Sequence, residues 1–420
     1  MAFEPRDRPA AVRALNALGR SLERAGVRPF SLDEEELLAE ARRRTGLSDF
    51  GDDAFREPLG IFLRALEGEA ALTLVGRFLA RRELLTWLAN RLELTDTWRR
   101  HPEILREEVR APLFVTGSGR SGTSLLHELL AQDPHSRVLR TWEALHPCPP
   151  PEAASQETDP RIARANREMR LWERIAPAYG TMHENGGAVP QECIYLTAHE
   201  LQSDLLSGSY QVPSYQAWLA RSDKARAYRY HRRMLQLLQW RCPGERWVLK
   251  APSHLWTLRE LFAVYPDARV VQTHRDPLVV VASMTSLVAT LFWLRSDRVD
   301  TRAIAKTWLR GVAFMLNHSL EQREQGLLPG GRIHDVLYHE LVRDPIGEVR
   351  KLYARFELEL TPESEARMRS YLAARPKDRR GAHRYSFADT GLDRARERAR
   401  FAAYQQRFGV PSEIGDETVS

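Results

Sequence analysis

An apolar run, a glycine-rich loop and an amphipathic helix follow one another directly, and this succession constrains the fold more than any other stretch. Residues 112–115, "PLFV", are predicted to form a buried strand, residues 117–124 read "GSGRSGTS", and residues 123–132 are predicted to form a helix. In such a unit the glycines let the backbone approach an anion, and the helix N-terminus adds partial positive charge. The unit favours an α/β fold with an anion-binding loop, although a purely structural glycine turn has the same pattern.

The loop follows the phosphate-binding spacing G-x-x-x-x-G-K-[ST] except at its lysine. Gly117, Gly122 and Ser124 fall on the pattern, and Thr123 stands where the lysine belongs. That lysine reaches the β- and γ-phosphates of a nucleoside triphosphate. Arg120, earlier in the loop, offers a cationic fork instead. We therefore expect a phosphate ligand other than that of a nucleoside triphosphatase.

Later apolar runs supply further strands for a parallel sheet. Residues 246–252 and 268–273 are predicted strands with a helix between them, which makes a β-α-β unit with a right-handed crossover. Residues 332–341 are predicted to form another strand. Residues 1–110 carry apolar positions at helical spacing and are predicted to form a helical N-terminal region.

Capping residues mark where several helices are expected to begin. Ser31 is the predicted N-cap of a helix in the N-terminal region. Asp276 with Pro277, Asp344 with Pro345, and Thr361 with Pro362 each place a capping side chain before a proline that suits the first helical position.

Composition narrows the class of protein. The three cysteines of this 420-residue chain lie far apart, which argues against a disulfide framework or a zinc site and fits a reducing cytoplasm. The net charge of +6 is compatible with binding to nucleic acid, to a membrane surface or to an anionic small ligand.

No secretory signal is recognised in the sequence. Residues 277–294 are uncharged, and we expect a helix buried in the α/β domain there rather than a membrane span.

A second candidate phosphate site follows the predicted strand at 268–273. Arg275 stands at the carboxyl end of that strand, where open α/β sheets bind ligands, and Ser283 comes eight residues later. The pair suits a phosphate, whereas an arginine at a strand end also commonly serves in a structural ion pair.

Two further stretches offer acid–base groups. Lys250 closes its predicted strand, and His254 follows it after a proline. Glu192 lies in "GAVPQECIYL" (187–196), where partial burial would raise its pKa and make it a base. A structural histidine and a helix-opening carboxylate are the alternatives.

Together and in this order, these stretches resemble the sulfotransferases that use 3′-phosphoadenosine 5′-phosphosulfate (PAPS), in particular a bacterial branch with a helical N-terminal extension. The resemblance rests on the lysine-free loop, on the "RDP" arginine with a serine eight residues later, and on the "K-x-P-x-H" segment at 250–254. It extends to "YHELVRDP" (338–345) and to the basic segment "RRGAHRYSFADTGLD" (379–393).

The resemblance implies which residues bind the donor. Arg275 and Ser283 would hold the 3′-phosphate. Many eukaryotic members carry a lysine where this chain has Arg120. The loop residues that would bind the 5′-phosphosulfate are Gly119, Arg120, Ser121, Gly122, Thr123 and Ser124. The residues of the basic segment that would close over the nucleotide are Arg380, Gly381 and His383.

The resemblance also implies in-line transfer to a hydroxyl or amine of a small-molecule, sugar or lipid acceptor, with 3′-phosphoadenosine 5′-phosphate (PAP) as product. Arg120 and Lys250 would stabilise charge on the leaving phosphate. His254 is the first candidate for the general base and Glu192 the reserve. No metal is expected to take part.

The expected fold is a P-loop-like three-layer α/β domain over 111–420, with a central parallel sheet flanked by helices, after the helical region 1–110. Residues 133–245 would form an insertion that shapes the acceptor pocket, and 379–420 a C-terminal basic segment and helix. Aromatic residues that either line this pocket or belong to the core are Trp142, Trp172, Tyr179, Tyr195, Phe292 and Trp293.

Three other functions compete with this interpretation. A P-loop kinase or nucleoside triphosphatase would need the missing lysine and an aspartate directly after an apolar strand. A nucleic-acid-binding protein would interleave basic and aromatic residues on one face; the motif residues instead fall at predicted strand ends, so we expect no nucleic-acid partner. A relative that binds the nucleotide without turnover would keep the same residues.

Overall fold

A computed structural model describes residues 8–177, 186–374 and 385–414. Its centre is a parallel sheet with the strand order β2-β3-β1-β4-β5. The strands are β1 (Leu113–Gly117), β2 (Ser136–Val138), β3 (Arg246–Lys250), β4 (Arg269–His274) and β5 (Ile333–Leu337). Strand β1 lies between β3 and β4, with Val115 paired to Lys250 on one side and to Val271 on the other. The parallel sheet flanked by helices confirms the predicted fold class.

Alternating side chains of β1 enter two different hydrophobic cores, one on each face of the sheet. Phe114 packs in the core that contains residues of α11 (Lys224–Gln239), α12 (Leu258–Val264), α13 (Pro277–Arg295) and α14 (Thr301–Glu324). Leu113 and Val115 pack in the core completed by α5 (Thr123–Leu130), α16 (Pro345–Arg355) and α17 (Pro362–Ala374). Because β1 is covered on both faces, it reads as a continuous apolar run in the sequence.

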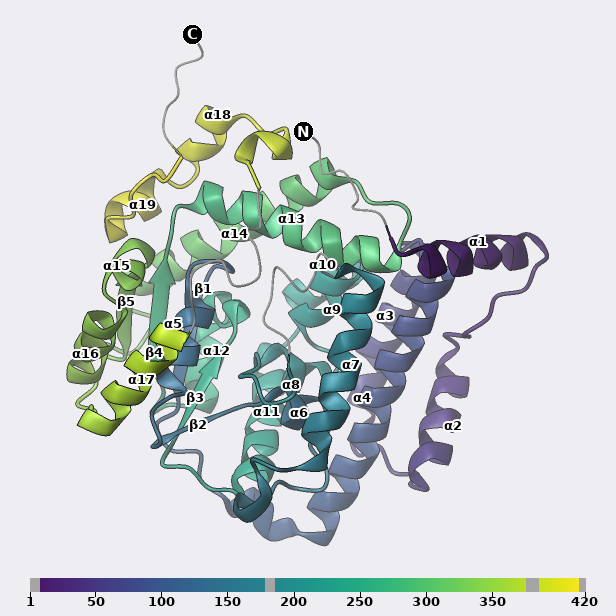
Figure 1. Cartoon of the computed structure of the whole chain (residues 1–420), viewed down its shortest axis with the longest axis horizontal. Coiled ribbons are helices and arrows are strands. Elements are labelled where there is room, and N and C mark those ends of the chain that lie inside the picture. The colour runs from purple at the N-terminus through teal and green to yellow at the C-terminus, as the bar shows by residue number, and fades with distance from the viewer. Residues whose placement is uncertain (1–7, 178–185, 375–384, 415–420) are drawn as a thin grey trace.

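Along the chain the helices fall into three groups: those before β1, those between β2 and β3, and the rest (Figure 1). The N-terminal group is α1 (Ala10–Arg24), α2 (Glu34–Thr45), α3 (Arg56–Gly68) and α4 (Leu74–Arg100). The helices between β2 and β3 are α6 (Thr141–Leu145), α7 (Pro160–Ile175), α8 (Ile194–Ala198), α9 (Asp204–Ser209), α10 (Pro213–Arg221) and α11 (Lys224–Gln239). The remaining helices are α5 (Thr123–Leu130), α12 (Leu258–Val264), α13 (Pro277–Arg295), α14 (Thr301–Glu324), α15 (Tyr338–Arg343), α16 (Pro345–Arg355), α17 (Pro362–Ala374), α18 (Arg394–Ala399) and α19 (Ala402–Phe408).

The N-terminal helices share a core with the segment that follows β2. Phe62 of α3 packs edge-on against Tyr210 and Tyr215, with ring centroids 5.6 Å and 5.2 Å apart. Helix α4 also meets the end of α13, where the Thr73 amide donates to the Arg295 carbonyl at 2.9 Å. The helical region 1–110, as far as it is described, is thus packed directly against the segment between β2 and β3 and against α13.

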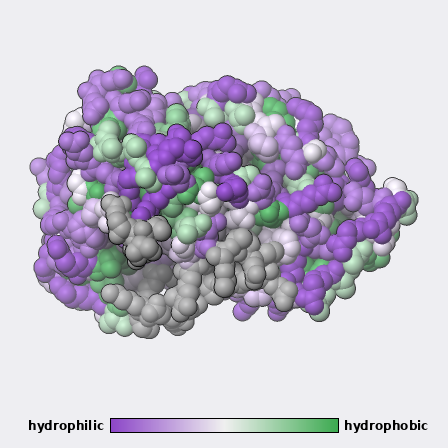
Figure 2. All heavy atoms as spheres, turned by 90° about the horizontal axis from the view of Figure 1, so that it is seen from above, coloured by the Kyte–Doolittle hydropathy of each residue, from purple (hydrophilic) through white to green (hydrophobic). Residues whose placement is uncertain are grey.

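Helix α13 is the apolar stretch that sequence alone made a candidate for a membrane span. Within the described residues it is the one helix long and apolar enough, with a mean hydropathy of 1.9 over its best window. However, 72% of that window is buried inside the structure. Its burial is that of a core helix of the α/β domain, as predicted. Seen from above in Figure 2, hydrophilic residues cover most of the surface and hydrophobic ones form small patches between them.

Some predicted boundaries are wrong. The predicted strand at 332–341 ends at Leu337, because the chain turns into α15 at Tyr338. Strand β2 was not predicted, since only three residues pair with β3. The N-cap of α2 is Asp33, whose carboxylate accepts from the Glu36 amide at 3.0 Å, so the Ser31 prediction is wrong.

Other predicted caps are confirmed. Asp276 accepts from the Leu278 amide at the start of α13, at 3.0 Å, and Asp344 accepts from the Gly347 amide at the start of α16, at 2.9 Å. Thr361 accepts from the Ser364 amide at the start of α17, at 3.1 Å. A side-chain oxygen before a helical proline thus satisfies a first-turn amide at all three positions.

Buried histidines predict a loss of stability in mild acid. Burial lowers the pKa of His127 and His231 to about 3 and that of His199 to about 4. Below about pH 6.5 these histidines are protonated in the unfolded chain but stay neutral in the folded one. Each of them therefore lowers the unfolding free energy by up to about 2 kcal/mol at pH 5.

We therefore expect the unfolding free energy, measured by urea titration, to fall steadily from pH 7 to pH 5. A His231→Phe variant should show a shallower fall over the same range, whatever its stability at pH 7. A pH-independent free energy in the unmodified chain would contradict the burial of these groups.

Candidate active site

The glycine-rich loop joins β1 to α5 and depends on two glycines. Gly117 has φ 142° and Gly122 has φ 94°, both in the region that L side chains rarely adopt. A Cβ atom on Gly117 would lie 2.4 Å from the Thr273 Oγ1 atom of β4. The loop therefore lies directly against the neighbouring strand, and no larger residue fits at that point.

Hydroxyl groups tie the loop to β4. The Ser121 Oγ atom lies 2.6 Å from Thr273 Oγ1 and donates to the Ser118 carbonyl at 2.5 Å. Ser118, Ser121 and Thr273 are fully buried. Arg120, at the tip of the loop, has a positive φ of 69°, a conformation that stores strain in a non-glycine residue and is common at functional sites.

The loop and the strand-end arginine, 155 residues apart in sequence, meet in space. Arg275 donates from Nη1 to the Arg120 carbonyl at 2.9 Å, and Arg120 donates from Nε to the Ser283 hydroxyl at 3.2 Å. Tyr338, the first residue of the "YHELVRDP" stretch, packs against the Arg275 guanidinium, with its ring centroid 3.9 Å from the Arg275 Cζ atom. Burial lowers the pKa of Arg120. Arg120 of the loop therefore lies together with Arg275 and Ser283 of the second predicted phosphate site. We call these three residues the arginine cluster.

A lysine–glutamate pair lies on the other side of the loop. Lys250 ends β3 and donates to the Glu192 carboxylate at 2.5 Å, and its Nζ lies 3.5 Å from the Ser124 hydroxyl of the loop. The Lys250 side chain is 3% exposed and that of Glu192 is 15% exposed, so water screens the pair only weakly. Three predicted site residues are thus brought together at this point.

Glu192 is positioned by backbone pairing between two distant segments. The Gln191 amide donates to the Leu139 carbonyl at 2.7 Å, and the Cys193 amide donates to the Lys250 carbonyl at 2.8 Å. One neighbour of Glu192 is therefore fixed to the residue that follows β2, and the other to the last residue of β3.

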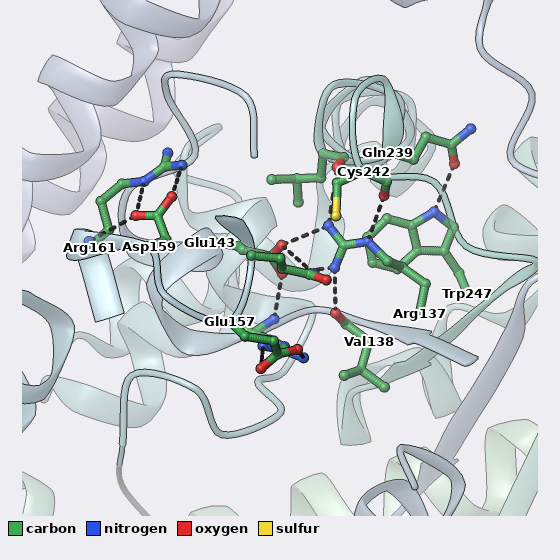
Figure 3. A network of polar contacts seen from close by, with 12 residues as sticks. Arg137, Val138, Glu143, Glu157, Asp159, Arg161, Gln239, Cys242 and Trp247 are labelled. Carbon is green, nitrogen blue, oxygen red and sulfur yellow. Dashed lines mark hydrogen bonds and ion pairs between the residues drawn. The ribbon is translucent and has the colours of Figure 1, made fainter. Parts of the chain in front are cut away.

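The segment around Leu139, whose carbonyl accepts the hydrogen bond from Gln191, is held by a buried ion-pair network (Figure 3). Arg137 of β2 contacts both oxygens of Glu143, at 2.6 Å and 3.1 Å, and stacks over the Trp247 ring at 4.6 Å. Glu143, which is fully buried, also accepts from the Arg140 amide at 2.9 Å. Arg140 extends the network to the surface, where its guanidinium pairs with Glu157 at 2.5 Å.

His254 lies apart from both groups, in an aromatic cluster. Its Nδ1 atom contacts the Tyr228 hydroxyl at 2.7 Å, and Phe114 packs edge-on against its ring at a centroid distance of 5.0 Å. Burial, and secondarily the charge of His231, hold the pKa of His254 well below its usual value. None of its hydrogen bonds or ring contacts among the described residues involves the loop or Lys250.

The hydrogen bonds around Tyr228 define the proton positions on His254. The Thr257 hydroxyl lies 3.2 Å from the Ser253 carbonyl, which can only accept, and 2.7 Å from the Tyr228 hydroxyl. All of these contacts are hydrogen bonds together only if Thr257 donates to the carbonyl, Tyr228 donates to Thr257, and His254 Nδ1–H donates to Tyr228. The Nε2 atom is then a bare acceptor, and it is buried without a partner among the described residues.

A small cavity of about 40 Å³ lies beside His254 and Tyr228. Cys193, next to Glu192, lines it, as do Ser253, His254 and Trp256, which follow Lys250 in the 3₁₀ helix at Pro252–Trp256. Its lining also includes the charged Asp204 and Lys224, whereas Glu192 and Lys250 do not line it.

Some predicted residues take no part in this geometry. Arg380, Gly381 and His383, and also Tyr179, lie outside the described residues. Of the other aromatic candidates, Trp142, Trp172, Tyr195 and Phe292 are buried and belong to the core. Sequence reasoning missed Thr273, which anchors the loop, and Glu413, which pairs with Arg275 at 2.8 Å. Thr273 has a sequence signal, since it lies two residues before Arg275, whereas Glu413 has none.

A sequence model of the sulfotransferase family matches residues 112–362, more than half of the chain. This chain belongs to the sulfotransferase family. The match begins just before β1 and includes the loop, the lysine–glutamate pair and the arginine cluster. The protein is therefore a transferase that moves a sulfuryl group, as the motifs indicated, and the kinase alternative finds no support.

Two solved mycobacterial structures are similar to this chain along most of its length. The sulfotransferase STF1 from Mycobacterium tuberculosis is 35% identical, with 90% of this chain and 100% of that chain covered and a TM-score of 0.79. The sulfotransferase STF9 from Mycobacterium avium is 29% identical, with 92% and 100% covered and a TM-score of 0.82.

A curated relative is more distant. The omega-hydroxy-beta-dihydromenaquinone-9 sulfotransferase Stf3 of Mycobacterium bovis is 25% identical over 286 residues. The aligned part covers 62% of this chain and 66% of the relative's length.

The buried network that supports Glu192 gives a prediction for stability. Glu143→Gln leaves the buried Arg137 charge without its counterion, which should lower the unfolding free energy by about 3–5 kcal/mol. The matched control is Glu157→Gln, which removes the same charge from the same network at a side chain that is 73% exposed. That control should cost less than about 1 kcal/mol. Equal losses for the two variants in urea titrations would contradict the distinction.

Proposed function

We propose that this sulfotransferase takes the sulfuryl group from PAPS and transfers it to a hydroxyl, or an amine, of a small acceptor. The observation that carries the proposal is the position of two separate groups on either side of one lysine-free loop. The arginine cluster offers a cationic phosphate site on one side, and the lysine–glutamate pair offers a base and a cation on the other.

The loop residues suit the 5′-phosphosulfate. Backbone N–H groups at the start of α5, which begins at Thr123 after Gly122, can donate to an anion. The Ser118 hydroxyl is buried without a partner among the described residues, so a donor is available within the loop. A Cβ on Gly119 would lie 2.7 Å from the Met284 sulfur, so the backbone there is closely packed. Gly119, Arg120 and the segment Ser121–Ser124 are accordingly assigned to this end of the donor.

Arg275 and Ser283 are assigned to the 3′-phosphate. Arg275 presents a planar fork of N–H donors that fits two phosphate oxygens, and its orientation is supported by the Arg120 carbonyl and the Tyr338 ring. Ser283 is buried two turns into α13 and already accepts a hydrogen bond from Arg120. Arg275 and Ser283 would thus bind the 3′-phosphate, while Arg120 remains assigned to the 5′-phosphosulfate.

The donor supplies an activated sulfuryl group and a phosphate leaving group. Glu192 would accept the proton of the acceptor hydroxyl as its oxygen forms the new bond to sulfur. Lys250, 2.5 Å from Glu192, and Arg120 would stabilise the negative charge that grows on the leaving phosphate oxygen as its bond to sulfur breaks. Each proton and charge then has a named group to receive or balance it.

The geometry favours Glu192 over His254 as the base. Glu192 is bonded to Lys250, which contacts the loop through Ser124, whereas His254 contacts Tyr228 and Phe114.

A lipid-like alcohol is the acceptor class that we propose. The name of the mycobacterial relative, a sulfotransferase of a hydroxylated menaquinone, supports this class. Sugars and other small hydroxylated molecules are the alternatives to test in the same screen.

The base assignment predicts how two variants differ. Glu192→Gln should lower kcat by about a hundredfold or more, because a neutral amide cannot accept the proton, while PAP binding stays close to that of the unmodified chain. His254→Asn keeps a side-chain donor for Tyr228 and should retain most of the turnover. Both variants are assayed with PAPS and a panel of alcohols, with PAP affinity measured by calorimetry.

The same measurements also test two alternatives, His254 as the base and a chain that binds the nucleotide without turnover. If His254→Asn loses turnover while its PAP affinity and melting temperature are unchanged, and Glu192→Gln remains active, the base is His254. If the unmodified chain transfers no sulfuryl group to any alcohol yet binds PAP, the chain is a nucleotide-binding relative without turnover.

A further inference from the structure

The C-terminal segment returns to the end of β4 and places a carboxylate on the arginine cluster. Glu413 contacts the Arg275 guanidinium at three distances, 2.9 Å and 3.1 Å from Nε and 2.8 Å from Nη2. No motif in the sequence indicated this pair. The Glu413 side chain is 30% exposed and that of Arg275 is 14% exposed, so solvent and ligands can approach the pair.

The position of Glu413 is fixed by the backbone, independently of its ion pair. Its amide donates to the Asp276 carboxylate at 2.8 Å, and the Ile414 amide lies 3.4 Å from the same oxygen. Asp276 is fully buried, caps α13 and also pairs with Arg398 of α18 at 2.6 Å. Asp276, which directly follows Arg275 in sequence, thus fixes the backbone of the segment that carries Glu413.

Glu413 uses the edge of Arg275 that a phosphate would use. A guanidinium binds an oxyanion best through two parallel N–H groups, and the Nε/Nη2 edge is one such fork. The Nη1 group of Arg275 is engaged with the Arg120 carbonyl at 2.9 Å, and one face of the guanidinium is covered by Tyr338. A carboxylate on the Nε/Nη2 edge and a phosphate on the same edge exclude one another.

We propose that Glu413 is a built-in competitor of the 3′-phosphate and thereby sets the affinity and release of the nucleotide. The inference rests on the proposed assignment of Arg275 to that phosphate. A phosphate monoester carries a charge of about −1.5 to −2 near neutral pH, so it outcompetes a single carboxylate for the arginine. As the product leaves, Glu413 returns to Arg275, which keeps the guanidinium paired and oriented between turnovers.

Competition predicts tighter nucleotide binding when the carboxylate is removed. Glu413→Gln should lower the dissociation constant of PAP about threefold to tenfold, as expected for loss of a partly exposed bidentate pair. The change should lie mainly in slower PAP release, and PAP should become a stronger product inhibitor. The affinity for AMP, which lacks the 3′-phosphate, should not change. Loss of a merely structural ion pair would instead leave PAP affinity unchanged or weaken it.

The matched control is Glu152→Gln, which removes a carboxylate from an exposed pair with Arg241 at 3.2 Å, outside the site. It should leave both affinities unchanged. Calorimetry and stopped-flow release of PAP are measured on the full chain, with Glu413→Ala as a second variant if Glu413→Gln melts at a lower temperature. PAP affinity that is unchanged or weaker in the Glu413 variants, with AMP as reference, overturns the inference.

Arg275→Ala separates this inference from the function on which it rests. If Arg275→Ala weakens PAP binding but Glu413→Gln does not strengthen it, only the competitor role of Glu413 fails. If Arg275→Ala binds PAP at full strength, the assignment of the 3′-phosphate to Arg275 fails, and the competitor role fails with it.

Discussion

The position of β1 between β3 and β4 is the constraint on which the candidate site depends. Because the three strands are parallel, their carboxyl ends lie at one edge of the sheet, where ligands bind in open α/β folds. The loop after Gly117, the amine of Lys250 and the guanidinium of Arg275 are all brought to that edge by their strands. The hydroxyl contact between Ser121 and Thr273 then closes the loop onto β4, which aligns the backbone of the loop with the arginine cluster.

Two cations of the site are each paired with an internal carboxylate. Lys250 pairs with Glu192, and Arg275 pairs with Glu413. An unpaired buried cation is costly, so internal counterions keep the guanidinium and the ammonium charged and oriented before a polyanionic ligand arrives. We propose different roles for the two carboxylates, since Glu192 accepts a proton whereas Glu413 yields its arginine to a phosphate. The arrangement stabilises the charged site without leaving it permanently occupied.

Much of this architecture could be predicted from the sequence, because the signals that indicate it lie within short segments of the chain. The fold class followed from apolar runs buried on both faces and from the glycine-rich turn before α5, both of which are properties of short segments. The same holds for the caps at Asp276, Asp344 and Thr361. The family followed from the order and spacing of several motifs, and the family match confirmed it. The grouping of Lys250 with Glu192 was less accessible, because it depends on the network around Arg137 that positions a segment far from β3 in sequence.

The features that sequence could not supply are long-range contacts made by ordinary residues. Strand β2 is too short to carry a periodic signal, and Glu413 lies in no motif that would mark it as a partner of Arg275. His254 has a motif, but its burial between Phe114 and Tyr228 is a property of the folded core. Motif residues therefore identify the edge of the sheet where the chemistry occurs, while the partners of those residues are determined by packing.

The loop and the arginine cluster together are proposed to form a site for a nucleotide with a 3′-phosphate. The most direct test compares the melting temperature of the unmodified chain with PAP, with AMP and with ATP–Mg²⁺, since a ligand that binds only the folded state raises it in proportion to occupancy. We predict a clear rise with PAP and little or none with AMP at equal concentration. A rise with ATP–Mg²⁺ and none with PAP would contradict a 3′-phosphate site.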